Sequence, residues 1–291
     1  MNPAELNHEL ADLTRQMAAG ELQLVEKRTN SLLQTNPDEP RLLCLLGRVE
    51  RLQDKRDLAR MHLETAARLA PRAMQVMSEL GYLALAEEAY ASAEGHFARV
   101  VNRNPANSDA LFNLGIALRQ QGKHQSAIAV LERCLVQSSD QLQQVHTELG
   151  TAHIMQRHEA AALEHFEQAL AIDREYAPAL HGMGMVKSAF GEFDEAADYF
   201  RAAMKHDPDF VEAYQQLVSI SRFDGSDHPD IQTMEKIVAD SERKSLTRET
   251  LHYALGKVYD DCGEFEQAFA HFVDANALRK ARLPAFDVAR M

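Results

Sequence analysis

Four histidines gather within a short stretch of the sequence and are the first candidates for metal chemistry. They are His146, His153, His158 and His165, and the first two lie seven residues apart, on one face of a helix. A metal site needs several ligands converging at about 2 Å from one ion. We expect packing and surface roles instead, because His146 and His153 face a packed helix interior, His158 lies in a turn and His165 on the next helix. No metal or cofactor is predicted.

The sequence gives little support for a catalytic nucleophile or for a phosphate-binding loop. Cys262 follows Asp260 and Asp261 in the turn YDDCGEF, and neighbouring carboxylates disfavour a thiolate. The two aspartates could ligate a cation, but adjacent carboxylates in a turn are usually solvated. The sequence holds no GxxxxGK[ST], HExxH or GxSxG motif, and HGMGM at Gly182–Gly184 lies inside a predicted helix. We therefore predict no catalytic residues, and this chain is expected not to be an enzyme.

The composition favours long helices and disfavours nucleic acid as a partner. Of 291 residues, 45% are hydrophobic and 26% charged, while glycine (13) and proline (9) are sparse, which argues against a turn-rich β protein. The formal net charge of −13 repels phosphate backbones. No nucleic-acid partner is expected.

The cysteines and the apolar segments indicate the cell compartment. Cys44, Cys134 and Cys262 lie far apart and form no CxxC pair, which fits a reducing cytoplasm. The N-terminal residues MNPAELNHEL lack the basic start and apolar run of a signal peptide. No stretch approaches the 18 apolar residues of a membrane span. We expect a cytoplasmic chain that does not contact membranes.

The strongest signal in the sequence is a repeat with a period of 34 residues. It is marked by small residues that recur every 34 or 35 residues and, once, after 72: Gly47, Gly81, Gly115, Gly150, Gly184 and Gly256. An alanine follows each glycine by 12 residues: Ala59, Ala93, Ala127, Ala162, Ala196 and Ala268. A large apolar residue follows by 16: Leu63, Phe97, Leu131, Phe166, Phe200 and Phe272. A proline follows three of the glycines by 24: Pro71, Pro105 and Pro208. Such a period is typical of stacked helical repeats.

This register resembles the tetratricopeptide repeat (TPR). The resemblance implies an all-α fold, a right-handed superhelical solenoid of TPR helix-turn-helix repeats. We interpret the glycine and the alanine as points where two helices cross closely, and the large apolar residue as filling the space between neighbouring repeats. The proline separates one repeat from the next, because it cannot continue a helix. Gly122, Gly191 and Gly263 are expected to end first helices in the left-handed conformation.

The repeats cover nearly all of residues 1–291, which we expect to form a single solenoid domain. The regular repeats are predicted at 40–73, 74–107, 108–142, 143–176, 177–210 and 249–282. A degenerate repeat at 6–39, with Leu13 for the small residue and Val25 for the alanine, is expected to act as a cap. The irregular repeat 211–248 should hold a first helix over Val211–Phe223, a break at FDGSDHPD, and a second helix near Asp230–Lys244.

In TPR proteins the first helix of each repeat lines a concave groove, so the resemblance implies a groove that binds a partner protein or peptide. Groove residues that packing does not require are predicted to contact that partner, and they combine cationic, aromatic, amide and hydroxyl groups: Arg48, Tyr82, Phe112, Asn113, Arg119 and Thr147. Arginine binds carboxylates in bidentate fashion and aromatic rings supply buried contact area. The alternative is an ordinary solvated helix face.

The best-known peptide-binding mode of the family is a clamp on a C-terminal carboxylate made by lysines and asparagines. The matching positions in this sequence hold Cys44, Arg48, Glu79 and Asn113, without the lysine–asparagine pair. Binding of chaperone tails is therefore not predicted.

The segment Leu251–Ala281 carries a second resemblance, to the last helical repeat of bacterial proteins that join TPRs to a sulfotransferase domain. The matching residues are Tyr259, Asp260, Asp261, Gly263, Ala268, Phe269, Asn276 and Leu278. In that family a catalytic domain follows, beginning with a loop that holds the donor's phosphate. No such loop precedes Met291, so no catalytic residue carries over, and the resemblance implies a repeat half without its enzyme half.

Three hypotheses follow from the sequence. The first is a binding scaffold whose groove holds an extended or helical segment of a partner protein. The second is the substrate-recruiting part of a sulfotransferase whose catalytic domain is absent from this chain. The third is an assembly protein whose end repeats pair into a homodimer.

Overall fold

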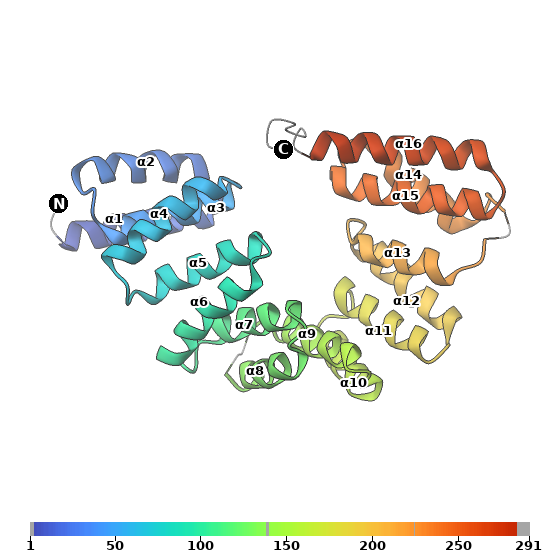
Figure 1. The fold of residues 1–291 in the computed structure, drawn as a ribbon, viewed down its shortest axis with the longest axis horizontal. Coiled ribbons are helices and arrows are strands. Elements are labelled where there is room, and N and C mark those ends of the chain that lie inside the picture. The colour runs from blue at the N-terminus through green and yellow to red at the C-terminus, as the bar shows by residue number, and fades with distance from the viewer. Residues whose placement is uncertain (1–2, 138–139, 224, 284–291) are drawn as a thin grey trace, which may run out of the picture. The chain divides into compact units, whose positions relative to one another are not determined.

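The computed structural model describes residues 3–137, 140–223 and 225–283, and within these ranges every regular element is an α-helix (Figure 1). The sixteen helices are α1 (Pro3–Ala18), α2 (Leu22–Thr35), α3 (Pro40–Leu52), α4 (Arg56–Leu69), α5 (Met74–Ala86), α6 (Tyr90–Arg103), α7 (Ser108–Gln120), α8 (His124–Gln137), α9 (Leu142–Met155), α10 (Glu159–Ile172), α11 (Ala177–Ala189), α12 (Phe193–His206), α13 (Val211–Ile220), α14 (Pro229–Ala239), α15 (Ser245–Asp261) and α16 (Phe265–Arg282). The all-α prediction is confirmed. None of the described helices is both long and apolar enough to cross a membrane.

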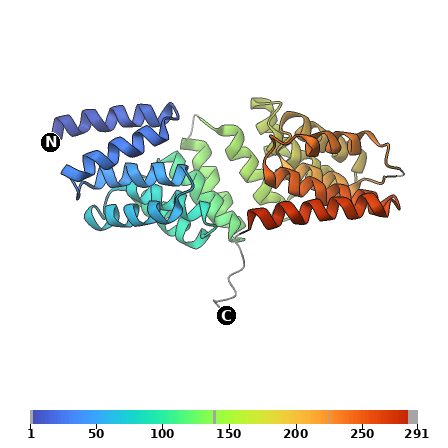
Figure 2. The same ribbon diagram turned by 90° about the horizontal axis from the view of Figure 1, so that it is seen from above.

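The chain divides into two compact units, Met1–Asp140 and Gln141–Met291. Unit 1 stacks the helix pairs α1–α2 to α7–α8, and unit 2 stacks α9–α10 to α15–α16. Each pair falls within one predicted repeat, apart from the starts of α1, α9 and α15, which lie three, one and four residues before their intervals. Both views show the two helices of the last pair, α15 and α16, side by side (Figures 1 and 2). A single domain over residues 1–291 stays a prediction.

In the six regular repeats, the glycine of the 34-residue register marks a close approach of the two helices of the pair. A Cβ atom built on Gly47 would lie 2.6 Å from Leu63 Cγ, and one on Gly150 would lie 2.8 Å from the ring of Phe166. The large apolar residue therefore packs first on the glycine of its own repeat, rather than only between repeats as predicted. Phe166 does both, because a Cβ atom on Gly182 of the next repeat would lie 2.2 Å from the same ring.

Each first helix that carries a marker glycine is followed by a residue with positive φ, seven positions after that glycine. Gly122, Gly191 and Gly263 adopt φ of 74°, 79° and 78°, as predicted. Asp54 (φ 60°), Glu88 (φ 56°) and Arg157 (φ 59°) take the same conformation without glycine. The turn geometry is thus imposed by the packing of the pair, and glycine only makes it easier to adopt.

The degenerate repeat 6–39 forms a helix pair in spite of its missing glycine. Leu13 and Val25, which replace the small residue and the alanine, are both fully buried. They pack with Met17 of the same repeat and with Leu45 and Val49 of the next. The larger side chains of Leu13 and Val25 are thus accommodated between α1 and α2, the first helix pair of unit 1.

The irregular repeat departs from the predicted helix bounds. Its first helix ends at Ile220 rather than Phe223, because Phe223 leaves the helix to enter the core, where it is 6% exposed. Asp224 of the predicted break lies outside the described residues. The second helix ends at Ala239, five residues before the predicted Lys244, and α15 then starts at Ser245. Arg201 on α12 fixes the start of α14 through bonds of 3.0–3.1 Å to the buried Asp230.

Candidate functional site

Glu79 on α5 is a buried carboxylate held by two arginines of the preceding repeat. It is 3% exposed, and its oxygens lie 3.0 Å from Arg51 Nη2 and 3.4 Å from Arg48 Nε. The Arg48 contact is an ion pair without hydrogen-bond alignment, since Arg48 Nε is a buried donor that no acceptor satisfies. Burial raises the pKa of Glu79 above its ordinary value, against the opposing pull of Arg51 and Arg48. The Glu79 carboxylate therefore holds the guanidinium groups of Arg48 and Arg51 in place before any partner binds.

The same chain of contacts continues onto the next first helix. The Arg51 guanidinium lies over the Tyr82 ring, 5.2 Å from its centroid, and the Tyr82 hydroxyl donates to the Asp109 carboxylate on α7. Burial, followed by this hydrogen bond to Asp109, raises the pKa of Tyr82. Asn113 Nδ2 donates to the backbone oxygen of Asp109 at 2.8 Å. We call Arg48, Arg51, Glu79, Tyr82, Asp109 and Asn113 the first-helix network, and the surface of α3, α5 and α7 that carries it the first-helix face.

The structure brings three of the six predicted groove residues into this network: Arg48, Tyr82 and Asn113. Phe112 is partly buried on α7, and Arg119 is a partly buried residue in the last turn of the same helix. Asn113 is only 8% exposed, so its amide chiefly supports Asp109 and offers a partner little surface.

Thr147 belongs to unit 2, on α9, whereas the other five groove residues belong to unit 1. It is 7% exposed and donates to the backbone oxygen of Gln143 at 2.8 Å. A groove that includes Thr147 as well as the first-helix face stays a prediction.

The histidine cluster forms, but as a packed group. His146 Nδ1 lies 3.1 Å from His165 Nδ1, and His153 stacks on His165 with ring centroids 5.4 Å apart. Burial, together with His146 and His153, lowers the pKa of His165 to about 4. Among the described residues, no group of three or more histidine, cysteine or acidic side chains could hold a metal ion.

The thiols are free cysteines in settings that disfavour reactivity. Burial raises the pKa of Cys44 to about 12 and that of Cys134 to about 11. Cys262 lies 3.5 Å from the backbone oxygen of Phe223. Buried thiols that stay protonated are inert packing residues.

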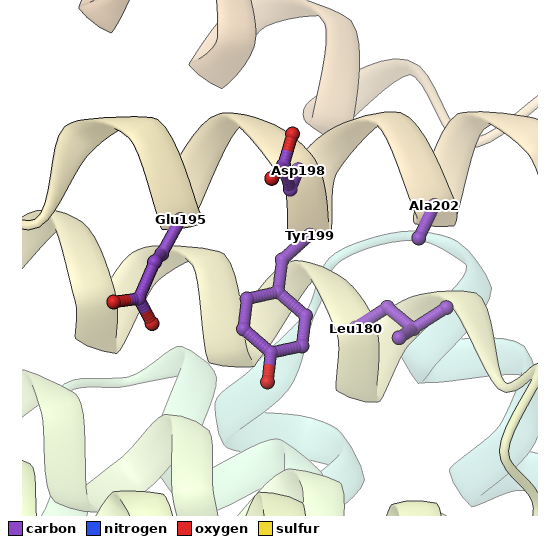
Figure 3. A pocket seen from close by; sticks show the side chains of 5 residues that line it. All are labelled: Leu180, Glu195, Asp198, Tyr199 and Ala202. Carbon is purple, nitrogen blue, oxygen red and sulfur yellow. The ribbon is translucent and has the colours of Figure 1, made fainter.

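Unit 2 contains concave features that the sequence did not indicate. One pocket of about 290 Å³ lies between α11 and α12, where Leu180 extends from α11 and Glu195, Asp198, Tyr199 and Ala202 extend from α12 (Figure 3). Its carboxylates are already paired, Glu195 with Lys187 at 2.7 Å and Asp198 with Arg201 at 3.0 Å.

A second pocket, of about 400 Å³, lies between α12 and the break of the irregular repeat. Arg201 and His228 line it together with the exposed ring of Phe193. The sequence signal that could have indicated this pocket is the break in the irregular repeat. The position of the break was predicted, but the residues that line the pocket were not.

Stacked helix pairs define the class of helical-repeat proteins. Two tetratricopeptide-repeat family models match the chain, one over residues 83–141 and one over residues 153–220. The chain thus contains tetratricopeptide repeats, and its fold is the all-α TPR solenoid that the register predicted.

Known TPR proteins resemble this chain at low sequence identity. Human tetratricopeptide repeat protein 6 is 23% identical over 144 residues, a match that covers 50% of this chain but only 27% of that protein. PilW, a widely conserved type IV pilus biogenesis factor, superposes with a TM-score of 0.65 at 18% identity, over 75% of this chain and 100% of PilW.

Two further solved structures share the fold. A TPR protein from Parabacteroides merdae gives a TM-score of 0.59 at 16% identity, over 91% of this chain and 96% of its own. YrrB, a TPR protein with an unusual peptide-binding site, gives a TM-score of 0.52 at 16% identity, over 64% of this chain and 96% of YrrB. At these identities the likeness shows the fold alone.

Proposed function

We propose that this chain is a non-catalytic scaffold that binds an extended or helical segment of a partner protein on the first-helix face of unit 1. The observation that carries the proposal is the unbroken first-helix network, which links three successive first helices. It fixes Arg48, Tyr82 and their neighbours in position, so little side-chain freedom is lost on binding. The peptide-binding site ascribed to YrrB, which has the same fold, supports a peptide as the ligand.

The first-helix face offers a partner two kinds of contact. The side chain of Arg48 is 39% exposed, and guanidinium nitrogens outside its ion pair can donate to a carboxylate of the partner. The partly buried ring of Phe112 offers apolar area, and one anchored apolar side chain contributes about 1.5–3 kcal/mol. A few such anchors suffice for binding at about micromolar Kd. We propose a cytoplasmic location for this function, which the three free cysteines support.

We expect Phe112→Ala and Arg48→Gln each to weaken partner capture about tenfold without unfolding the chain, because each removes one anchor. Arg48→Glu is the less informative change, since it would set a like charge against the buried Glu79. A partner isolated by affinity capture from the source cell is titrated against each variant by calorimetry.

The matched controls for this experiment are Phe193→Ala and Arg133→Gln, which alter an exposed phenylalanine and an exposed arginine outside the first-helix face. Unchanged affinity in both Phe112→Ala and Arg48→Gln would remove the first-helix face from consideration.

A second candidate function is the substrate-recruiting part of a sulfotransferase, and one surface favours it. On α16, Phe265, Phe269 and Val273 are 68%, 70% and 49% exposed. In a preceding repeat, the position of Phe269 is held by Arg60, which pairs with Glu87 of the following repeat at 2.7 Å. We propose that a sulfotransferase domain, of the kind joined to the repeat that Leu251–Ala281 resembles, covers this apolar stripe.

The encoding reading frame and the oligomeric state test this second candidate. A frame that continues into a phosphate-binding loop supports it, and a frame without one removes it. The competing occupant of the stripe is a second copy of the chain, as the homodimer hypothesis requires. Light scattering over a concentration series should then show a dimer that Phe269→Glu dissociates, whereas a monomer throughout eliminates the homodimer.

A further inference from the structure

The irregular repeat leaves a pocket at its contact with the last helix pair. The second helices α2, α4, α6, α8, α10 and α12 each have 14 residues, but α14 has 11 and stops at Ala239. The 18-residue α16 packs beside α15 (Figure 1). A pocket of about 450 Å³ opens where α14 ends, lined by Val238, by Arg248 and His252 of α15, and by the α16 residues Asp274, Ala277, Leu278 and Ala281. This volume suits a small ligand.

The pocket holds two opposite charges that do not pair with each other. Arg248 Nε donates to the backbone oxygen of Val238 at 3.1 Å, which fixes the guanidinium at the end of α14. Within the described residues Arg248 has no carboxylate partner, and Asp274 has no cation partner. Burial is the largest effect on the pKa of His252 and lowers it. Asp274 raises the same pKa and Arg248 lowers it, so both charges lie near the His252 ring. The pocket therefore presents a donor and an acceptor that are open to a ligand.

His252 supplies a third polar group in a fixed orientation. It is 6% exposed, and its Nδ1 lies 3.0 Å from His271 Nδ1. His271 Nε2 lies 3.1 Å from a carboxylate oxygen of Glu235, which also accepts from the Tyr259 hydroxyl. A carboxylate only accepts, so with both imidazoles neutral His271 donates from Nε2 and accepts at Nδ1, and His252 donates from Nδ1. Nε2 of His252 is left as an acceptor, and no described residue donates a hydrogen bond to it.

We propose that this pocket binds a free α-amino acid with an aliphatic side chain. The carboxylate of the ligand bonds to Arg248, its ammonium group bonds to Asp274 and to Nε2 of His252, and its side chain packs on Val238, Leu278 and the alanines of α16. A zwitterion matches the separated charges, which neither a simple anion nor a simple cation does. The apolar lining selects an aliphatic side chain over a polar one.

The test uses the full chain and L-leucine as the probe, with binding followed by calorimetry. We expect saturable 1:1 binding of leucine. Leucinamide, which lacks the carboxylate, and 4-methylpentanoate, which lacks the ammonium group, should each bind about tenfold more weakly or worse. No binding of leucine overturns the proposal, and so does binding of either analogue as tight as that of leucine.

Variants locate the site. Arg248→Gln and Asp274→Asn are each expected to reduce leucine affinity about tenfold. Arg279→Gln and Glu266→Gln, exposed positions of α16 outside the pocket, serve as matched controls and should bind leucine as the unaltered chain does. Circular dichroism establishes that each variant is folded. Leucine binding that survives both pocket variants would overturn the assignment, while partner capture on the first-helix face would be unaffected by this outcome.

Discussion

Phe166→Ala should lower the free energy of unfolding of unit 2 by about 3–5 kcal/mol, the range for a buried phenylalanine replaced by alanine. Its side chain is fully buried and fills the space over two glycines, Gly150 of its own repeat and Gly182 of the next. Neither glycine has a side chain that can move into the vacated space, so the cavity persists. Because the ring bridges two repeats, its loss weakens both a helix pair and the stacking of one pair on the next.

Urea unfolding followed by circular dichroism measures this loss, with Phe193→Ala as the control. Phe193 is 53% exposed, so its truncation should change the free energy of unfolding by less than about 0.5 kcal/mol. If Phe166→Ala and Phe193→Ala lost equal amounts of unfolding free energy, the Phe166 ring would not be a bridge between repeats, and the packing scheme would be contradicted.

The fold followed from the sequence because its determinants are local and periodic. Gly47 and Leu63, sixteen residues apart, contact each other within one helix pair, so spacing along the chain predicted contact in space. The positive φ of Gly122 was predictable for the same reason. The end of α13 was not, because it depends on Phe223 finding room in a core built from several repeats. A contact with distant residues leaves no periodic trace in the sequence.

The candidate site was predicted only as a set of exposed positions. The register placed Arg48 and Tyr82 on first helices, but the burial of Glu79 between two arginines depends on side-chain directions across repeats. The pocket at the end of α14 was missed altogether. It arises from a helix three residues shorter than its counterparts, and Arg248, His252 and Asp274 have no distinctive spacing in the sequence.

Lowering the pH from 7.5 to 5 should destabilise unit 2 through two partly buried histidines, His165 and His181. His181 lies between the rings of Phe200 and Phe210, with centroids 5.5 Å and 5.2 Å away, and its Nε2 is buried without a hydrogen-bond partner. Burial lowers the pKa of His181 from 6.5 to about 4, as burial and two neighbouring histidines do for His165. A protonated imidazole has no counter-charge in such surroundings.

The sign of the effect follows from which state binds the proton. At pH 7.5 both histidines are neutral in the folded and the unfolded chain, so their contribution is fully present. Below pH 6.5 the unfolded chain binds protons that the folded chain does not, and stability falls until the folded groups titrate near pH 4. At about 1.4 kcal/mol per pH unit, His181 removes at most about 2 kcal/mol by pH 5, and the more exposed His165 removes less because solvent screens its charge.

His181→Leu separates this contribution from that of other titrating groups. The leucine keeps the apolar contact with Phe200 and Phe210 but binds no proton, so the loss of unfolding free energy between pH 7.5 and 5 should shrink by up to about 2 kcal/mol. His158→Gln, which alters an exposed histidine of the same unit, should leave the pH dependence as it is. A pH dependence in His181→Leu equal to that of the unaltered chain would show that water reaches His181 and that the core of this repeat opens in the folded state.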